Sequence, residues 1–413
     1  MTETILFDRA TVLDAAAGTL TADRRVLVED GTIAAVGGPD LAAPAGARTV
    51  DLAGRTLMPG LIDCHVHLNA HSADLAAVAD ASPAWVALKA AEELRATLGR
   101  GFTTVRDLGG ADFGLRDAIE EGLVEGPRLH FGGKALSQTG GHADLRPPGR
   151  ARREDHRCSP GIGLVCDGVD EVRSAARQQL RTGAHHVKVM LSGGVASPTD
   201  RVDSTQFSIE EIRAAVEEAE AANRYVAGHA YTARAINRGL KAGVRTIEHG
   251  NLLDESSIEL FNEHGAFLVP TLVTYQRMSV EGAEFGLPET SRRKNTIVLE
   301  AGLEALSAAH RGGVEIAFGT DLLGGMRKHQ LDEFRIRARV IPAADVIRSA
   351  TVTAARLLGA EGRLGAVAPG AAADLLVVEG DPFEDIEVVA DPDRHLKLVV
   401  KDGRTHLDRL GGA

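Results

Sequence analysis

Residues 57–71, LMPGLIDCHVHLNAH, end an apolar run with two histidines one position apart, His65 and His67. Successive side chains of a β-strand point to opposite faces, so in a strand both imidazoles lie on one side and Cys64 points away. Two imidazoles that converge in this way can hold one metal ion, but they can equally be ordinary polar residues at the end of a strand. The rest of the sequence has to decide between these two interpretations.

The composition is that of a globular protein, with 413 residues, 44% of them hydrophobic and 25% charged. A formal net charge of −12 argues against a nucleic-acid-binding surface. The first residues show no secretory signal and no apolar run of about 18 residues occurs, so we expect no membrane span. Three cysteines are too few for a disulfide framework and favour a reducing, cytoplasmic compartment. We expect Cys64 to be buried, and we assign no role to Cys158 and Cys166.

Both ends of the chain have the character of β-structure. RRVLVEDGTIAAVGG (24–38) and LKLVVKDGRTH (396–406) are β-rich runs bounded by turn residues, and the EDG at 29–31 predicts a hairpin turn. We therefore expect residues 1–56 and 359–413 to form one composite β-sandwich domain.

Residues 57–358 instead alternate short apolar runs with amphipathic stretches such as SIEEIRAAVEEAEAAN (208–223), whose Ser208 and Glu211 form a capping box. Eight such units predict an α/β fold, a (β/α)8 TIM-like barrel with its active site at the carboxyl ends of the strands. Two long loops, 135–168 and 191–208, are expected to shape a substrate pocket. The eight predicted strands are LIDCHVH (61–67), TTVRDLG (103–109), RLHFGGK (128–134), AHHVKVM (184–190), RYVAGHA (224–230), VRTIEHG (244–250), AFLVPTL (266–272) and EIAFGTD (315–321).

Five of these predicted strands carry polar side chains suited to metal binding near their carboxyl ends. Four imidazoles and one carboxylate at the same face of a barrel would suffice for zinc or a similar divalent ion. The residues concerned, in chain order, are His65, His67, Lys188, His229, His249 and Asp321.

Lys188 needs a separate argument, because a protonated amine repels a cation. Its neighbours in HHVKVML are apolar, and desolvation could lower its pKa and expose a nucleophilic amine. Reaction of that amine with carbon dioxide gives an anionic carbamate able to bridge two metal ions. A lysine that reaches solvent or pairs with Asp321 is the alternative.

Several motifs carry a resemblance to a known family. PGLIDCHVHL, HVKVML, GHA, IEHG and FGTD resemble the amidohydrolase superfamily in its binuclear form with a carboxylated lysine. SQTGGHAD, KVMLSGGVASPTD and GHAYTARAINRGLKAGVRTIEHGNLLDE are similar to its prolidase-like branch. That branch holds Xaa-Pro dipeptidases, carboxypeptidases that release other C-terminal residues, and ochratoxin-type amide hydrolases.

The resemblance implies two divalent metal ions, with zinc first and manganese or cobalt as alternatives. His142 in TGGHAD and Tyr231 in HAYT match positions that such enzymes use at the substrate. The implied metal ligands are His65, His67 and Asp321 for one ion, His229 and His249 for the other, and carboxylated Lys188 between them.

The same resemblance implies a mechanism. A hydroxide between the two metals would attack an amide carbonyl, and Asp321 would take the proton of the water and return it to the leaving nitrogen. His142 and Tyr231 would donate hydrogen bonds to the developing oxyanion. A guanidinium could bind a substrate carboxylate in two-point fashion, and the candidates are Arg201 and the loop residues Arg146, Arg150, Arg152, Arg153 and Arg157.

We therefore expect a hydrolase of dipeptides or N-acyl amino acids, with a small-molecule substrate, no nucleic-acid or membrane partner, and a homo-oligomeric state. A lactonase or organophosphate-type esterase is the second hypothesis, since the same hydroxide attacks esters. A deaminase or cyclic-amide hydrolase is the third, and metal stoichiometry separates it, because such deaminases commonly use one metal. A non-catalytic scaffold is disfavoured, since it would be expected to lose metal ligands.

Overall fold

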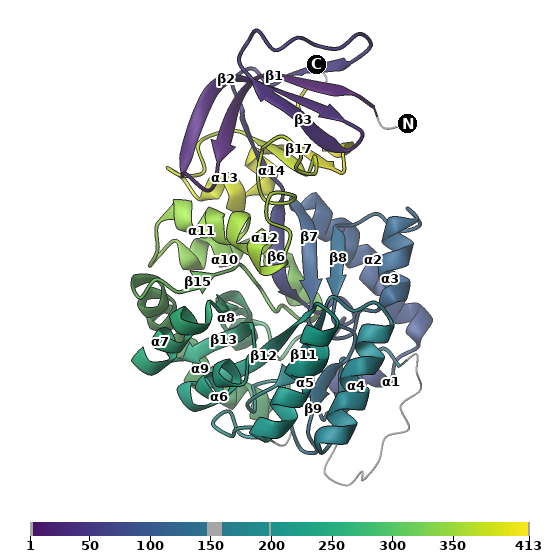
Figure 1. The fold of residues 1–413 in the computed structure, drawn as a ribbon, viewed down its shortest axis with the longest axis vertical. Helices are drawn as coiled ribbons and strands as arrows, with labels where there is room; N and C mark the ends of the chain where they lie inside the picture. Colours follow the sequence, from purple (N-terminus) through teal and green to yellow (C-terminus); the bar gives the residue numbers. More distant parts are fainter. Residues whose placement is uncertain (1–2, 147–158, 198–199, 412–413) are drawn as a thin grey trace.

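The computed structural model describes residues 3–146, 159–197 and 200–411. Figure 1 shows an elongated molecule, with a β-rich unit at the top that holds both termini and a larger α/β unit below it. The two ends of the chain thus meet in one unit, while the middle of the chain forms the other.

All eight predicted strands of the α/β unit are present, and each runs parallel to its neighbours. They form two sheets, one of order β6-β7-β8 and one of order β10-β9-β11-β12-β13-β14-β15. Two further short strands, β9 (Ala135–Ser137) and β10 (Gly163–Val165), lie in the first long loop and were not predicted. The eight strands are β6 (Leu61–Val66), β7 (Phe102–Asp107), β8 (Arg128–Phe131), β11 (His186–Met190), β12 (Tyr225–Thr232), β13 (Thr246–Leu252), β14 (Phe267–Val269) and β15 (Glu315–Ile316).

Backbone hydrogen bonds join the two parallel sheets at both sides. The amide of Cys64 donates to the carbonyl of Phe318 over 2.8 Å, and the amide of His185 donates to the carbonyl of Phe131 over 2.8 Å. The α/β fold with parallel strands is therefore confirmed, and its connections agree with a TIM-like barrel.

Helices flank the strands, as the alternating pattern predicts (Figure 1). In α5 (Ile209–Ala221) the capping box is present, since Ser208 accepts from the amide of Glu211 and the Glu211 side chain accepts from the amide of Ser208. The main helices that follow strands are α2 (Pro83–Gly99), α3 (Phe113–Glu120), α4 (Val169–Arg181), α6 (Ala233–Lys241), α7 (Glu255–His264), α8 (Leu272–Val280) and α9 (Glu289–Arg311).

The core of the α/β unit lies between these helices and the parallel strands. Val187, Val189, Val226 and Ile247 on the central strands are at most 1% exposed. Burying one side chain of this size stabilises the fold by about 1.5–3 kcal/mol. A continuous apolar cluster of this kind holds the strand ends, and the polar groups on them, in fixed positions.

The β-rich unit is one eight-stranded sheet of order β18-β17-β16-β5-β1-β2-β3, with β4 paired to β1. β5 pairs parallel with β1 and antiparallel with β16, so it joins the two ends of the chain. The predicted division of the chain at 56 and 359, and the expected sandwich of two sheets, stay predictions. The strands are β1 (Ile5–Asp14), β2 (Thr19–Glu29), β3 (Thr32–Gly37), β4 (Arg48–Asp51), β5 (Thr56–Pro59), β16 (Leu375–Val378), β17 (Leu396–Lys401) and β18 (Arg404–Asp408).

The predicted hairpin turn at 29–31 is confirmed between β2 and β3. Asp30 and Gly31 have φ angles of 48° and 76°, the left-handed values that a two-residue turn between twisted strands requires. A side chain on residue 31 would also meet the backbone of Asp402 at 2.9 Å, so glycine is required there for a second reason.

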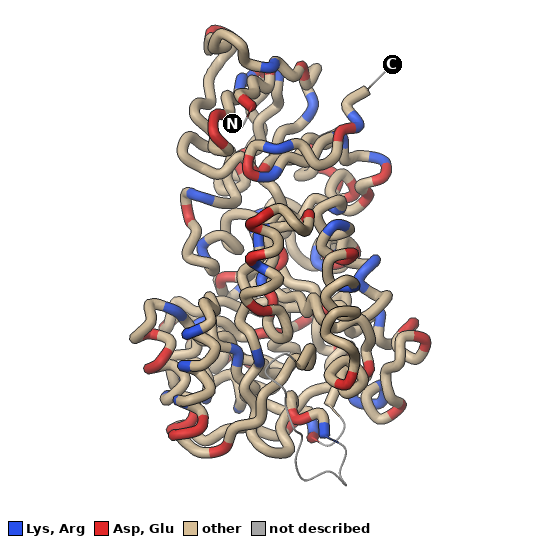
Figure 2. Tube along the Cα trace, turned by 90° about the vertical axis from the view of Figure 1, so that its right-hand side faces the viewer, with Lys and Arg blue, Asp and Glu red and all other residues tan. Residues whose placement is uncertain are grey.

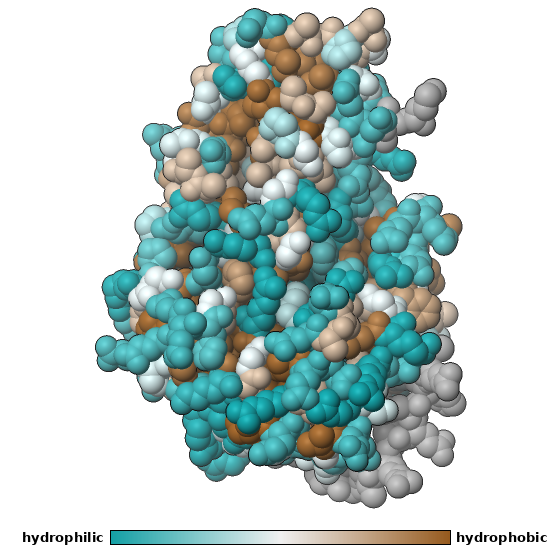
Figure 3. Space-filling view, in the orientation of Figure 1, coloured by the Kyte–Doolittle hydropathy of each residue, from teal (hydrophilic) through white to brown (hydrophobic). Residues whose placement is uncertain are grey.

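Short helices complete the described chain, and none of its helices is long and apolar enough to cross a membrane. Basic and acidic residues are interspersed along the chain in the view of Figure 2. On the face in Figure 3, apolar side chains gather over the β-rich unit, while the α/β unit is mostly hydrophilic. The short helices are α1 (Leu75–Asp80), η1 (Gly324–His329), α10 (Asp332–Arg337), α11 (Ala343–Ser349), α12 (Val352–Leu357), α13 (Glu387–Ala390) and α14 (Pro392–His395).

Candidate metal centre and active site

One cavity lies at the carboxyl ends of the parallel strands, where a barrel of this type places its site. Polar groups from β6, β11, β12 and β13 and from the segments after β9 and β15 converge on it. Its lining includes eight residues singled out from the sequence: His65, His67, His142, Lys188, His229, Tyr231, His249 and Asp321.

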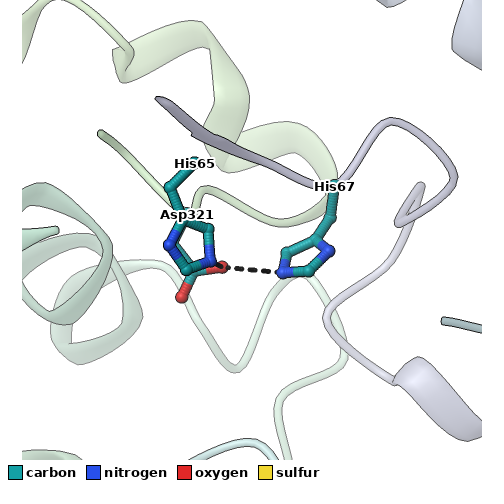
Figure 4. A group of neighbouring side chains, drawn as sticks. All are labelled: His65, His67 and Asp321. Atoms are coloured by element: carbon teal, nitrogen blue, oxygen red, sulfur yellow. Dashed lines mark ion pairs between the residues drawn. The ribbon is translucent and has the colours of Figure 1, made fainter. Parts of the chain in front are cut away.

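His65, His67 and Asp321 form one group, in which one ligand atom of each lies within 4.8 Å of the others (Figure 4). Nε2 of His65 is 3.4 Å and Nε2 of His67 is 3.3 Å from Oδ1 of Asp321. On the far side of each ring, Nδ1 lies 2.9 Å from an oxygen that can only accept, of Glu248 for His65 and of Gly109 for His67. Each Nδ1 therefore carries a proton, and each Nε2 faces Asp321, where it binds either a proton shared with that carboxylate or a cation.

The second group consists of His229, His249 and Lys188. The ring centroids of His229 and His249 are 4.5 Å apart, and His249 lies 4.9 Å from the ring of His65, so the two groups are contiguous. Burial lowers the pKa of His229 well below its usual value and that of His249 to about 3. Both imidazoles are therefore neutral, the form that binds a metal.

Lys188 is 2% exposed, and burial lowers the pKa of its amine to about 8. The predicted effect of its apolar surroundings is therefore present in the structure. Near neutral pH a sizeable fraction of this amine is unprotonated and nucleophilic. The donor set of four imidazoles, one carboxylate and this amine fits two divalent cations with nitrogen and oxygen ligands.

Asp321 is an anion in this site. Burial alone would raise its pKa, but the neighbouring His65 and the hydrogen bond from His67 outweigh burial and hold the pKa below its usual range. Burial would likewise lower the pKa of His67, but its bond to Asp321 raises it. The pair is thus a shared-proton contact at a place where a cation can replace the proton.

Two of the candidate ligands have strained backbones. His249 and Asp321 have φ angles of 75° and 51°, in the left-handed region that side chains other than glycine rarely adopt. Each such residue costs about 1–3 kcal/mol and persists only where the surroundings enforce it. The amide of Asp321 donates to the carbonyl of His65 over 2.8 Å, which holds the carboxylate beside the two histidines.

A buried ion pair, Arg106 with Glu248, contacts His65 and holds its ring in place. The sequence analysis did not predict it. The guanidinium of Arg106 on β7 lies 2.8 Å from Oε1 of Glu248 and donates to the carbonyl of Cys64 over 2.6 Å. Both charged side chains are fully buried, and the other carboxylate oxygen of Glu248 binds His65. Charged residues inside otherwise apolar strand segments were the sequence signal that could have identified this pair.

Asp63 is a second unpredicted support. Its Oδ1 accepts from the amide of His65 over 3.0 Å, and its Oδ2 accepts from Thr320 over 2.7 Å and Gln330 over 2.8 Å. Burial raises the pKa of Asp63 to about 6. The carboxyl group thus ties the strand of His65 to the residue before Asp321.

Tyr275 is a further residue that the sequence analysis missed. Its hydroxyl lies 3.0 Å from that of Tyr231 and 2.8 Å from Nδ1 of His249, and it lines the same cavity. No local motif marks it, because it reaches the site from inside α8 and not from a strand end. Tyr231 and Tyr275 together place two hydroxyl groups beside the second metal group.

The two predicted substrate-binding arginines that the structure describes, Arg146 and Arg201, do not line this cavity. Arg201 is 81% exposed at its side chain and forms an ion pair with Asp203 over 2.7 Å, and Arg146 pairs with Asp144 over 2.6 Å. Cys64 and Cys166 are buried free thiols, as expected for Cys64. The calls on Arg150, Arg152, Arg153, Arg157 and Cys158 lie outside the described residues.

Comparison with known proteins agrees with this geometry. Residues 56–406 match the model of the amidohydrolase family. The chain is 36% identical to an ochratoxinase from Aspergillus niger over 354 residues, which cover 81% of this chain and 72% of the relative.

Solved structures of amidohydrolases also match this chain. An amidohydrolase is 47% identical with a TM-score of 0.96, over 99% of this chain and 100% of that one. A prolidase in complex with N-methylphosphonate-L-proline is 48% identical with a TM-score of 0.95, over 97% of this chain and 99% of that one. These matches confirm the predicted resemblance, and the chain belongs to the amidohydrolase family, in its prolidase-like branch.

Proposed function

We propose that this protein is a binuclear metal-dependent hydrolase that cleaves the amide bond of dipeptides or N-acyl amino acids, on a (β/α)8 barrel and with zinc as the first candidate metal. The observation that carries the proposal is the convergence of four imidazoles, one carboxylate and a buried lysine of lowered pKa on one cavity. A relative that is a prolidase and one that is an ochratoxinase support amide hydrolysis.

The residues present divide the work between binding and proton transfer. Two divalent metal ions held by His65, His67, Asp321, His229, His249 and the carbamate of Lys188 would supply Lewis acidity that brings the pKa of a water to about 7. Asp321, an anion in contact with two imidazoles, would take up the proton of the attacking water and pass it to the leaving nitrogen.

Hydrogen-bond donors surround the position of the scissile amide. Tyr231 lines the cavity, and burial keeps its hydroxyl protonated by raising its pKa far above the usual value. This hydroxyl donates to the oxygen that becomes negative in the transition state, and the ring of His142 lines the same cavity as a second polar contact for the substrate.

The rest of the lining suggests a preference in substrate. Apolar side chains, among them Met190, Val195 and Met278, share the cavity with the polar groups, and its described lining holds no arginine. A small apolar residue on the leaving side therefore fits better than a charged one. We propose Xaa-Pro or a similar apolar C-terminal residue as the best substrate.

The test is hydrolysis of a panel by the zinc-loaded protein with metal counted per chain. The panel holds Xaa-Pro, Xaa-Leu and Xaa-Arg dipeptides, N-acyl amino acids, a lactone and a phosphotriester. We expect cleavage of Xaa-Pro or Xaa-Leu with about two metals bound, the binuclear stoichiometry that the donor set predicts. Two metals with cleavage of the lactone or triester alone would replace amide hydrolysis by the esterase hypothesis, and one metal with no amide cleavage would favour a deaminase.

A second candidate function is supported by one of the comparisons. The 36% identity to an ochratoxinase favours amides that join an amino acid to an aromatic acyl group. An N-aroyl amino acid in the panel separates this activity from dipeptide cleavage. A homo-oligomeric state and a cytoplasmic location stay predictions, for which gel filtration with light scattering and cell fractionation are the measurements.

A further inference from the structure

The ring of His142 packs against His229 and Gly194. On one face it stacks on His229, with centroids 4.2 Å apart and planes at 21°. On the other face lies Gly194, where a Cβ would come within 2.2 Å of Cε1 of the ring. A side chain at position 194 would therefore collide with this ring, and stacking on His229 sets the plane of the imidazole.

The hydrogen bonds at Nδ1 of His142 fix the position of its proton. Nδ1 lies 2.9 Å from Oγ of Ser197, and that hydroxyl is in short contact with Oδ1 of Asp200. A carboxylate only accepts, so the single proton of Ser197 points to Asp200. Oγ of Ser197 must then accept from His142, and Nδ1 is the protonated nitrogen.

Asp200 is an anion despite being almost fully buried. Burial would raise its pKa, but hydrogen bonds from His142 and Ser197 and the charge of Lys294 lower it to about 2. Its Oδ2 also accepts from the amide of Gly194 over 3.2 Å and from Gln206 over 3.0 Å. Gln206 in turn accepts from the amide of His142 over 2.9 Å, so backbone and ring of His142 are tied to the same group.

Lys294 reaches this loop from α9, almost a hundred positions further along the chain. Its ammonium donates to the carbonyl oxygens of Gly194 and Ser197, each over 2.8 Å, and of Asp200 over 3.1 Å. It also lies 3.3 Å from the carboxylate of Asp200. This partly buried cation thus holds the backbone of the loop after β11 close to the group that binds His142.

We propose that Asp200, held by Lys294, is a positioning residue that keeps His142 in the Nδ1-protonated tautomer through Ser197, so that Nε2 is the nitrogen presented to the substrate. Nε2 has no hydrogen-bond partner among the described residues, and the ring lines the cavity. In this tautomer the lone pair of Nε2 faces the cavity, so His142 accepts a hydrogen bond from the substrate there. Only the kinetic part of this inference rests on the proposed function.

The tautomer is tested without activity. In protein labelled with 15N-histidine, a long-range 1H–15N spectrum separates Nδ1-protonated from Nε2-protonated rings, and His142→Asn identifies the signals of His142. We expect the Nδ1-protonated pattern in the wild type and a change toward the other tautomer in Asp200→Asn, whose amide can donate to Nδ1. An Nε2-protonated wild type, or the same pattern in both proteins, would overturn the proposal even if the enzyme hydrolyses dipeptides.

The kinetic consequence is a loss confined to turnover. We expect Asp200→Asn to lower kcat by about 10–100-fold, as for other residues that orient a site histidine, with KM within threefold and metal content unchanged. Asp203→Asn is the matched control, because Asp203 lies in the same loop but is 61% exposed and pairs with Arg201. The double variant of Asp200→Asn and His142→Asn should be no slower than His142→Asn, and an additional loss would show that Asp200 acts by another route.

The substitution Lys294→Met tests the contacts between Lys294 and the loop after β11. We expect faster hydrogen–deuterium exchange in peptides around Gly194 and the same loss of kcat as in Asp200→Asn, with Lys294→Arg in between. Lys89→Met, on the exposed surface of α2, is the control. Unchanged exchange and unchanged kcat in Lys294→Met would remove Lys294 from the proposal. If the wild type cleaves no amide, the proposed function fails, while the spectra and the exchange data still decide the positioning.

Discussion

The amino and carboxyl ends of the parallel strands differ in how their ionisable side chains are arranged. The amino ends face a crevice of about 1290 Å³ toward the β-rich unit, where Arg128 contacts both Asp374 and Asp402 and His406 contacts Glu125. The carboxyl ends enclose a much smaller cavity, on which imidazoles, a carboxylate and an amine converge.

The difference teaches that volume is a poor guide to chemistry in this molecule. At the amino ends, Arg128 pairs with the buried Asp374 and with the half-exposed Asp402, so these charges are balanced by contacts that join the two units. At the carboxyl ends ionisable groups are buried with pKa values displaced by several units, which costs stability and is typical of a functional site.

The strongest test of the comparison is Asp321→Asn. We expect kcat to fall by at least about 10³-fold, because the amide can bind a cation but cannot carry the proton of the attacking water. Metal content, measured by plasma mass spectrometry, should stay near that of the wild type. Asp393→Asn, on a side chain that is 94% exposed, is the control and should leave kcat unchanged. Residual activity above a tenth of the wild type would remove Asp321 as the proton carrier.

Lys188→Ala should have the next largest effect. Without the bridging carbamate we expect about one metal per chain and a loss of kcat of about 100-fold or more, with partial rescue by added acetate or formate. Lys89→Ala, on an exposed lysine, serves as the control. Two metals per chain in Lys188→Ala would show that the carbamate is not a ligand.

The lowered pKa of Lys188 also predicts a pH dependence for metal loading. The neutral amine reacts with carbon dioxide, and with a pKa of about 8 its fraction falls about tenfold for each unit below pH 8. Reconstitution of the metal-free protein in bicarbonate should therefore be much slower at pH 6.5 than at pH 8.5. Lys188→Glu carries a permanent carboxylate and should load at similar rates at both values. An equal pH dependence in that variant would assign the effect to His67, whose pKa is raised.

Much of this site was predictable because it follows the strand pattern. His65, His67, Lys188 and His249 stand on or beside apolar strand runs, and the barrel rule places such strand ends together. The resemblance added roles that spacing could not supply, such as that of His142. The folded chain was needed for contacts between segments that no local pattern connects.

The residues that hold the site in place show why the sequence alone was not enough. Lys294 and Tyr275 reach the cavity region from helices, and their contacts depend on how α8 and α9 pack on the strands. Arg201 shows the same point, since the length of its loop did not indicate that its side chain would be exposed and paired with Asp203. Its binding to a substrate carboxylate stays a prediction.

A fourth prediction separates support of the metal ligands from support of the fold. Replacing both partners of the buried pair, Glu248→Leu with Arg106→Met, should lower metal affinity by about 10–100-fold because Nδ1 of His65 loses its acceptor. Melting temperature should change little, since a buried ion pair is often replaced by apolar residues without loss. Chelator competition and thermal unfolding are the measurements.

The chain offers a matched control for that double variant. Glu333 and Arg337 form another fully buried pair, 2.7 Å apart on α10, and contact none of the predicted ligands. Glu333→Leu with Arg337→Met makes the same chemical change and should leave metal affinity within about twofold. Equal losses of affinity in both double variants would mean that the effect comes through the fold and not through His65.

The smallest effect is expected for Arg201→Ala. Its guanidinium is exposed and pairs with Asp203, and exposed ion pairs contribute little, so stability should hardly change and KM for a dipeptide should change by less than about twofold. Asp203→Ala removes the partner of the same guanidinium and should have an equally small effect. A tenfold rise in KM for Arg201→Ala would contradict this expectation, because the loss of an exposed contact with Asp203 does not explain it. Such a rise would mean that the guanidinium leaves Asp203 and binds the substrate carboxylate, as the sequence analysis predicts.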